Sequence, residues 1–351
     1  MTIEDVLAKL DPKLRKLVSV GHDVQVHKLT TPSYGLNRAL RGGFAYGRQV
    51  LIWGNKSAGK AQPIDTLVPT PTGYIALGDI RPGDYVFGSD GKPTKVMAVM
   101  PQGVLSCYKV TMNDGTFTFC NGEHLWTVQT HKQKYGVGRN GNRLSDKWKT
   151  LTLNEIIING LYRNDFKTSY KYFLPSRPPV DFELNVDLPV DPYLLGVLLG
   201  DGYIKDDVSF CSCDEFIVNK IESRNPGINI TRRKRSSNVQ HYGVINFRNK
   251  IRALGLMGTS SRTKFVPTIY MTAPLADRME LIRGLMDTDG SGGSEHKARF
   301  HTSNECLAHQ MAQLVRSVGG FAKVFSLHDG LFVVTIWTPE NPFSLPRKVK
   351  K

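Results

Sequence analysis

The sequence predicts a multidomain protein in which an incomplete α/β segment precedes a compact all-β unit and a larger α+β domain of two similar halves. A buried strand at residues 48–53 leads into the phosphate-loop pattern G-x-x-x-x-G-K at residues 54–60, but no helix follows. After Lys60 the composition changes to short alternating strands and turns. Farther along, two apolar helices end in Asp-Gly, at Asp201 and at Asp289.

Length, charge and cysteine pattern limit the class of protein. A chain of 351 residues is long enough for two or three domains, and a net charge of +15 favours contact with nucleic acid over a merely solvated surface. The longest apolar run is too short to span a membrane, and no signal sequence is visible, so we expect a cytoplasmic protein without a membrane partner. The cysteines form no C-x-x-C or zinc-type pattern, so we expect reduced thiols and no zinc: Cys107, Cys120, Cys211, Cys213 and Cys306.

Residues 1–60 carry the first resemblance. The stretch GLNRALRGGFAYGRQVLIWGNKSAGK resembles the approach to the nucleotide site in RecA-type recombinases, including those of phages. The resemblance implies an α/β RecA-like fragment in which Gly54, Gly59 and Lys60 bind nucleotide phosphates. One core strand cannot make that domain alone, so we expect ATP binding only after the phosphate loop is restored.

The loop is interrupted at Ala61, which lacks the hydroxyl that would bind Mg²⁺, and Pro63 opens a run without helical periodicity. Residues 61–130 then resemble the N-terminal splicing blocks of inteins, in the stretches LVPTPTGYIALGDIRPGDYVFGSDGKPTKV and TFTFCNGEHLWTVQT. The resemblance implies an all-β Hint-like splicing domain inserted into the phosphate loop of a bacterial or phage host protein.

The splicing blocks imply roles for three residues. His124 would protonate the amine that leaves the Lys60–Ala61 bond, although a buried or surface histidine is the plain alternative. Ala61 is not a nucleophile, so either it is an engineered block or the intein naturally lacks that group. A tryptophan two residues after His124, at Trp126, resembles the pattern of inteins in which an internal cysteine attacks the upstream bond directly. A core tryptophan is the alternative.

Residues 341–351 would lead into a C-terminal part of the splicing domain. Inteins end in a His-Asn pair and further strands, which this chain does not show. We therefore expect splicing only with a C-terminal intein and extein fragment as partner.

After a connector at residues 131–186, residues 187–340 contain the two Asp-Gly helices. Crossing of the helices would bring Asp201 and Asp289 together, and paired carboxylates bind Mg²⁺ and activate water against phosphodiesters. Each helix has a face of small residues that would allow this crossing: Gly196 and Gly200 in the first, Gly284 and Thr288 in the second. The pattern resembles LAGLIDADG homing endonucleases, which implies two pseudo-symmetric ααββ halves whose β-saddle lies in the major groove of double-stranded DNA.

Further residues of this domain have expected roles. Lys264 matches a position where the family often carries a lysine near the scissile phosphate, with a surface lysine as the alternative. Asp287 is assigned to a structural role at the helix end. A basic cluster suits phosphate contacts, with a solubility patch as the equal alternative: Arg232, Arg233, Lys234 and Arg235.

The sequence thus predicts Mg²⁺-dependent, site-specific double-strand DNA cleavage aimed at the intein-free recombinase gene. One alternative is the N-terminal partner of a split intein whose endonuclease only binds DNA. Another is an ATP-dependent recombinase with a decayed insert. Asp201 and Asp289 argue against decay, and Ala61 argues against nucleotide binding.

Overall fold

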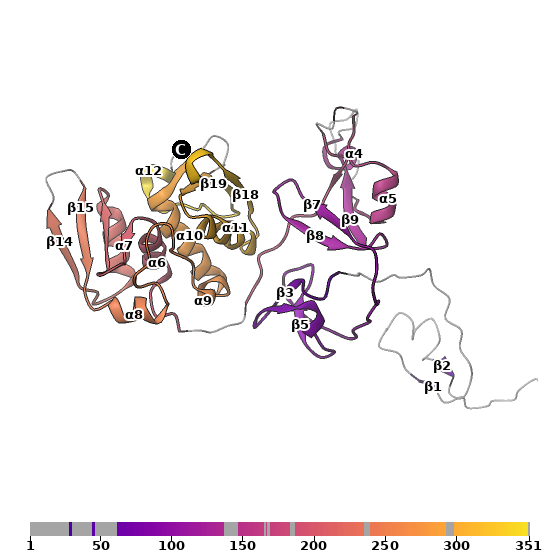
Figure 1. Ribbon diagram of the computed structural model, residues 1–351, viewed down its shortest axis with the longest axis horizontal. Coiled ribbons are helices and arrows are strands. Elements are labelled where there is room, and N and C mark those ends of the chain that lie inside the picture. Colours follow the sequence, from indigo (N-terminus) through magenta and orange to yellow (C-terminus); the bar gives the residue numbers. More distant parts are fainter. Residues whose placement is uncertain are drawn as a thin grey trace, which may run out of the picture. The chain divides into compact units, whose positions relative to one another are not determined.

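The computed structural model describes residues 62–136, 147–164, 166, 169–182, 187–234, 239–292 and 298–349, together with the backbone of two short strands, β1 (Lys28–Leu29) and β2 (Phe44–Ala45). The chain divides into the units Met1–Lys56 and Ser57–Lys351. Figure 1 traces the second unit from its purple β-strands to its yellow C-terminal helices. The predicted phosphate-loop residues and Ala61 lie outside the described residues, so their roles stay predictions: Gly54, Gly59, Lys60 and Ala61.

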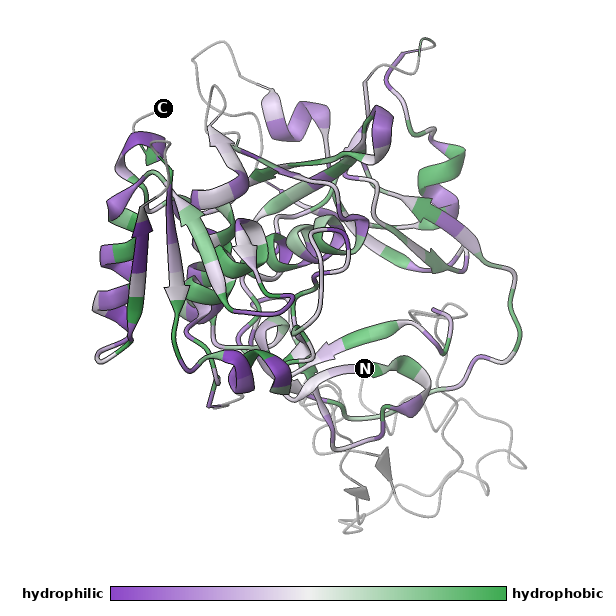
Figure 2. Cartoon of the chain, turned by 60° about the vertical axis from the view of Figure 1, so that its left-hand side comes forward, coloured by the Kyte–Doolittle hydropathy of each residue, from purple (hydrophilic) through white to green (hydrophobic). Residues whose placement is uncertain are grey.

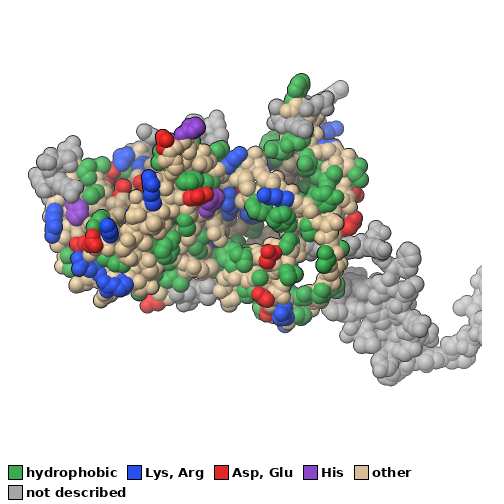
Figure 3. Space-filling view, viewed as in Figure 1, with side chains coloured by type: hydrophobic (Ala, Val, Ile, Leu, Met, Phe, Trp, Pro, Cys, Tyr) green, Lys and Arg blue, Asp and Glu red, His purple; other side chains and the backbone are tan. Residues whose placement is uncertain are grey.

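Three antiparallel hairpins form what we call the β-hairpin unit, residues 62–120. The last hairpin turns at Gly115, whose φ of 84° lies in the left-handed region that glycine adopts without strain. The hairpins are β3 (Leu67–Thr70) with β4 (Gly73–Ala76), β5 (Tyr85–Phe87) with β6 (Pro93–Lys95), and β7 (Tyr108–Thr111) with β8 (Phe117–Cys120); a 3₁₀ turn, η1 (Leu77–Asp79), follows β4. Strands and turns were expected here, and apolar side chains cover much of this unit's visible surface in Figure 3.

A further sheet extends into the expected connector. Strand β9 (Leu125–Thr130) pairs on one side with β10 (Lys149–Thr152) and on the other with β11 (Tyr172–Phe173). Helices α4 (His131–Tyr135) and α5 (Leu153–Ile158) each begin with a capping box, at Thr130 and Thr152. The boundary at residue 130 therefore cuts through a sheet rather than between domains.

The α+β domain contains two halves of the same plan. We expected ααββ halves, but each has the order α-β-β-α-β-β, because a short strand begins at the glycine of each Asp-Gly. The sheet orders are β12-β13-β15-β14 and β16-β17-β19-β18, both antiparallel. The first half is α6 (Pro192–Gly200), β12 (Gly202–Tyr203), β13 (Ser209–Ser212), α7 (Glu215–Arg224), β14 (Ile230–Lys234) and β15 (Gln240–Val244), followed by α8 (Arg248–Ala253) and α9 (Thr268–Met271). The second is α10 (Leu275–Asp289), β16 (Gly290–Gly292), β17 (Ala298–Thr302), α11 (Glu305–Ser317), β18 (Phe321–Ser326), η2 (His328–Gly330), β19 (Phe332–Trp337) and α12 (Pro346–Val349).

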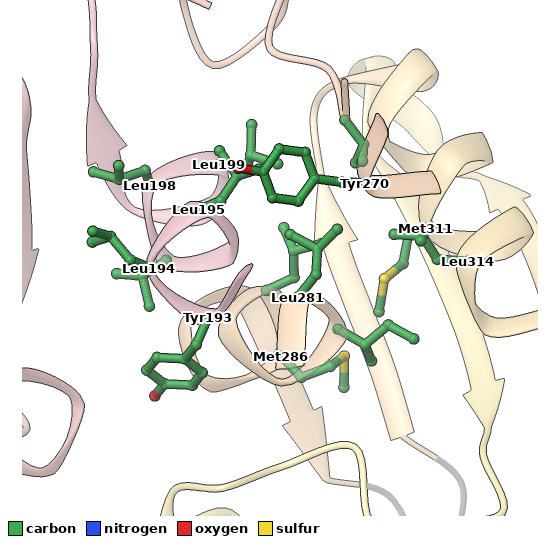
Figure 4. Close-up of a cluster of buried hydrophobic side chains, with 14 of the residues drawn as sticks. Tyr193, Leu194, Leu195, Leu198, Leu199, Tyr270, Leu281, Met286, Met311 and Leu314 are labelled. Carbon is green, nitrogen blue, oxygen red and sulfur yellow. The ribbon is translucent and has the colours of Figure 1, made fainter. Parts of the chain in front are cut away.

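Helices α6 and α10 pack directly against each other in the middle of one hydrophobic core. A Cβ added to Gly196 would lie 2.5 Å from the Leu281 carbonyl oxygen, and one added to Gly284 would collide with the Tyr193 carbonyl oxygen. Only glycine allows this approach, as the small-residue faces predicted. Figure 4 shows Leu195 and Leu199 of α6 beside Tyr270, with Leu194 and Leu198 on the opposite side of the helix. Figure 2 shows hydrophobic colour gathered on the central helices.

The C-terminal segment belongs to this core. We expected the domain to end at residue 340, but Phe343 and Leu345 are buried in the same cluster as α6 and α10. The packed domain therefore extends at least to Val349. Among the described residues, no helix has the length and apolar character that a membrane crossing requires.

Candidate active site

The two Asp-Gly sequences meet where α6 and α10 end side by side. Asp201 is the C-cap of α6, and Asp289 is the last residue of α10. A Cβ on Gly200 would lie 3.1 Å from a carboxylate oxygen of Asp289 and would collide with the hydroxyl of Thr288. Glycine at position 200 therefore lets the second carboxylate approach the end of the first helix.

Both carboxyl groups have raised pKa values. Burial, and next the charge of Asp201, raise the pKa of Asp289 to about 6, against the opposing effect of Lys264 and Lys348. Burial also raises the pKa of Asp201, although the residue keeps contact with solvent, and the same two lysines again oppose the shift. A carboxylate whose charge is disfavoured both by burial and by a second carboxylate forms a site that a cation would stabilise.

Lys264 is a buried lysine at the end of α6, with 3% of its surface exposed. Its Nζ donates hydrogen bonds to the carbonyl oxygens of Leu198 (2.8 Å), Leu199 (3.2 Å), Gly200 (3.2 Å) and Gly202 (2.7 Å). Those of Leu198, Leu199 and Gly200 are among the carbonyls that a helix end leaves without partners, and they carry its partial negative charge, whereas Gly202 belongs to β12. Burial lowers the pKa of Lys264 to about 8, although Asp289 and Asp201 favour its charged form.

Lys348 performs the same role at α10 and was missed by the sequence analysis. Its Nζ donates to the carbonyl oxygens of Met286 (3.0 Å), Asp287 (2.8 Å) and Thr288 (3.0 Å). Burial lowers its pKa as well. The sequence does contain a signal for this role, because Lys264 follows the first Asp-Gly and Lys348 follows the second at a similar distance along the chain. Assigning residues 341–351 to another domain hid it.

Asp287 holds the C-terminal segment against α10. One carboxylate oxygen accepts from the backbone N–H groups of Ser344 (3.0 Å) and Leu345 (3.0 Å), and the other accepts from the Tyr193 hydroxyl (2.8 Å). All these contacts are internal to the protein, as the expected structural role requires. By anchoring this segment, Asp287 also positions Lys348.

The predicted basic cluster divides between the two faces of β14. Arg232 lies opposite buried Tyr242 and within 4.0 Å of Glu222 on α7, so it is on the helix-covered face. Arg233 is opposite His241 on the other face, and it is exposed. The side chain of Lys234 and all of Arg235 lie outside the described residues. Of the described residues in the predicted cluster, Arg233 alone is thus shown on the open face of the first sheet. We define this open face by Thr231, Arg233, Cys211 and His241.

The open face of the second sheet mixes charge with aromatic surface. Strand pairing places Arg299 and Lys323 opposite Thr335, and Phe325 opposite Val333. The ammonium group of Lys323 lies 5.2 Å from the ring centroid of Phe325. This face comprises Arg299, His301, Phe321, Lys323, Phe325, Val333, Thr335 and Trp337.

The residues expected to serve splicing lie together in the β9 region. The rings of His124 and Trp126 are 5.4 Å apart, and His124 is buried. Burial raises the pKa of Cys120, while the neighbouring Trp126 indole opposes that rise. Because Ala61 lies outside the described residues, the distance from His124 to the upstream bond stays untested.

No family model matches the chain. The replicative DNA helicase DnaB of Mycobacterium intracellulare is 30% identical over 326 residues, which cover 85% of this chain and 51% of the helicase. DnaB of Mycobacterium leprae is 34% identical over 92 residues, covering 26% of this chain and 14% of the helicase. The chain thus spans about half the length of the first of these relatives and less of the second.

Three solved structures show partial likeness. The homing endonuclease I-DmoI in complex with DNA and Mn has a TM-score of 0.32 at 14% identity, covering 42% of this chain and 89% of that one. The N-terminal LAGLIDADG domain of DUF199/WhiA has a TM-score of 0.30 at 11% identity, covering 48% of this chain and 90% of that one. The Msm DnaB1 intein splicing domain bound with zinc has a TM-score of 0.19 at 37% identity, covering 20% of this chain and 56% of that one. These TM-scores are too low to assign a fold by likeness, so the fold rests on the elements described above.

Proposed function

We propose that the chain is an intein-type insertion whose α+β domain, the LAGLIDADG-like unit of residues 187–349, cuts double-stranded DNA at a specific site with the help of Mg²⁺. One observation carries the proposal: Asp201 and Asp289 end two glycine-packed helices, and burial together with the charge of Asp201 raises the pKa of Asp289 beside two capping lysines. Structural carboxylates are usually paired with donors, as Asp287 is, whereas burial and the charge of Asp201 disfavour the charged form of Asp289.

The donor set fits Mg²⁺. No group of three or more His, Cys, Asp or Glu side chains lies close enough to hold a metal anywhere in the described part of the chain. Mg²⁺ is commonly held by one or two carboxylates, with water and substrate phosphate oxygens completing the shell. Asp201 and Asp289 would hold the ion, which when bound supplies activation of water for in-line attack. Lys264 and Lys348 keep positive charge beside the place a scissile phosphate would occupy.

The open faces of the two sheets supply the DNA contacts in this proposal. Arg233 and His241 on the first face, and Arg299 and Lys323 on the second, present donors suited to phosphates and base edges. The net charge of +15 adds non-specific attraction to DNA.

The target would be the host gene without the insertion, at the codons of the phosphate loop. The sequence predicts a recombinase host, whereas the curated relatives are named replicative helicases, and we favour a helicase host for that reason. ATP binding by Gly54, Gly59 and Lys60 would belong to the host protein after the loop is rejoined.

Plasmid cleavage tests the proposal. The full chain is mixed with Mg²⁺ and a plasmid carrying the uninterrupted loop-coding sequence, beside Asp289→Asn and a control, Asp329→Asn, in an exposed turn. We expect linear plasmid from the wild type and the control, and none from Asp289→Asn. DNA binding without cutting would reject the nuclease and leave a DNA-binding remnant.

Splicing with a C-terminal partner is the second candidate. It is favoured by the His124–Trp126 contact and by exposed aromatic rings on the last hairpin, Phe117 at 55% and Phe119 at 40%. Such rings are suited to further strands that would complete the β-fold. Mixing the chain with the downstream fragment should give a ligated host product on a denaturing gel, and His124→Ala should prevent it. Equal ligation by His124→Ala would rule out the role of His124.

A further inference from the structure

Arg278, in the first turns of α10, places a charged group in the core with 0% of its surface exposed. Its Nε donates to the Ala273 carbonyl oxygen at 2.7 Å, and its Nη1 donates to both the carbonyl (2.8 Å) and the hydroxyl (2.7 Å) of Ser317. Its Nη2 donates to the Val180 carbonyl oxygen. A buried guanidinium is tolerated only when its donors are satisfied, so Val180 is part of what stabilises α10.

Val180 belongs to a segment, residues 177–182, that we call the strap. The Val180 N–H also donates to the Ser317 carbonyl oxygen, at 2.9 Å. Both backbone groups of Val180 therefore bond to the second half of the α+β domain. Gly319, just after α11, contacts Pro179 so closely that an added Cβ would lie 3.1 Å from the proline ring. The strap therefore packs on α10 and α11 through backbone contacts that a flexible linker would lack.

The other side of the strap packs on the β-hairpin unit. The Phe182 ring is 2% exposed, lies 5.5 Å from Phe87 of β5 and 6.1 Å from Tyr74 of β4, and has the Arg278 guanidinium 5.0 Å from its centroid. A Cβ on Gly91 would collide with the Pro179 carbonyl oxygen. One buried ring thus contacts two hairpins of the β-hairpin unit and the charged group of α10.

A second contact joins the same parts by charge. Asp114, in the turn between β7 and β8, lies 3.4 Å from Arg316 Nε on α11 and 3.6 Å from an Arg177 guanidinium nitrogen in the strap. Burial alone would raise the pKa of Asp114, but hydrogen bonds from Thr116 and the two arginines lower it overall. Asp114 is 5% exposed, and the Arg316 side chain is largely buried as well, so the contact between these two residues is shielded from salt.

We infer that the strap is a built clamp through which the β-hairpin unit supports α10, so that this unit and the helix carrying Asp289 are stabilised together. The Arg278 guanidinium is satisfied only when α10, α11 and the strap are in place, and the Phe182 ring that covers it packs fully only when the hairpins are in place as well. The inference does not depend on nuclease activity, because it concerns stability alone.

Hydrogen exchange of the full chain under native conditions tests the clamp. Phe182→Ala removes the ring shared by both sides, and Phe166→Ala is the matched control because Phe166, in the same connector, is 86% exposed. For Phe182→Ala we expect exchange to become at least tenfold faster in β4 and β5 and also in the first turns of α10, a change of about 1.4 kcal/mol in opening free energy. Phe166→Ala should change neither region.

Acceleration on one side only would overturn the inference, since the two parts would then be stabilised separately. If Phe182→Ala fails to fold, Phe182→Leu keeps apolar volume while removing the ring face that covers Arg278. This variant should show a smaller acceleration in the same two regions. An effect confined to either region, or unchanged exchange in both, would contradict the clamp equally.

Discussion

The two halves of the α+β domain share a backbone plan but differ in the chemistry of their helix ends. Asp201 is exposed, and Lys264, which caps its helix, is almost completely buried. Asp289 is less exposed and has a pKa of about 6, and Lys348, which caps its helix, is only partly buried. Symmetry of the backbone therefore does not make the two carboxylates equivalent. The second is the one whose charge the fold disfavours most.

The origin of each lysine explains part of this difference. Lys264 arrives from the segment between the halves and caps four carbonyls, whereas Lys348 arrives from the C-terminal segment and caps three. The C-terminal segment is in turn held by Asp287. The second helix end thus depends on a contact that the first does not need.

Loss of either carboxylate should have the largest effect. We expect Asp201→Asn and Asp289→Asn each to reduce DNA cleavage more than about a hundredfold, because one ion shared by both ligands is lost with either. Cleavage rates at saturating DNA would check this. Normal cleavage by Asp201→Asn alone would show that the halves do not share a site.

Removing the capping lysine of either half should lower the free energy of unfolding, and by more in the first half than in the second. Lys264→Met leaves four carbonyls without a donor and should cost about 3 kcal/mol, and Lys348→Met, with three carbonyls and more water nearby, about 1–2 kcal/mol. Urea unfolding of both variants would measure the difference. Lys323→Met, on the sheet surface, is the control. A larger loss for Lys348→Met would reverse the proposed order.

The pH dependence of stability should depend on Asp289. Its folded-state pKa of about 6 exceeds the ordinary value of 3.8, so its contribution to stability is present below about pH 4 and is lost as pH rises through 6. Without metal, Asp289→Asn should therefore be more stable than wild type at pH 7.5, by about 1–2 kcal/mol, and equally stable at pH 4. Melting curves at both pH values would check this. A less stable variant at pH 7.5 would contradict the shift.

The smallest effect should come from the two arginines of β14. Arg233→Gln removes charge from the open face and should weaken DNA binding a few-fold, reducing the slope of log affinity against log salt by about 1. Arg232→Gln, on the helix-covered face, should leave the slope unchanged. Equal slopes for the two variants would show that the first sheet does not contact DNA as proposed.

Local patterns predicted the elements well, and contacts between distant segments were not visible in the sequence. The short strands and turns after Lys60 and the small-residue faces of α6 and α10 follow from periodicity and turn chemistry. The division of Arg232 from Arg233 depends on strand register, which a run of charged residues does not reveal. The roles of Lys348 and Val180 depend on packing of chain segments far apart in sequence. Such contacts carry no local signature.

The most direct test of the central claim is the effect of Mg²⁺ on thermal unfolding of the full chain at pH 7.5. A cation held by both carboxylates relieves their repulsion and binds only the folded state, so the melting temperature should rise with Mg²⁺ concentration. We expect that rise in wild type and in Asp329→Asn, and its loss in both Asp201→Asn and Asp289→Asn. An equal rise in all four proteins would show that Mg²⁺ binds elsewhere and that the paired helix ends are not the metal site.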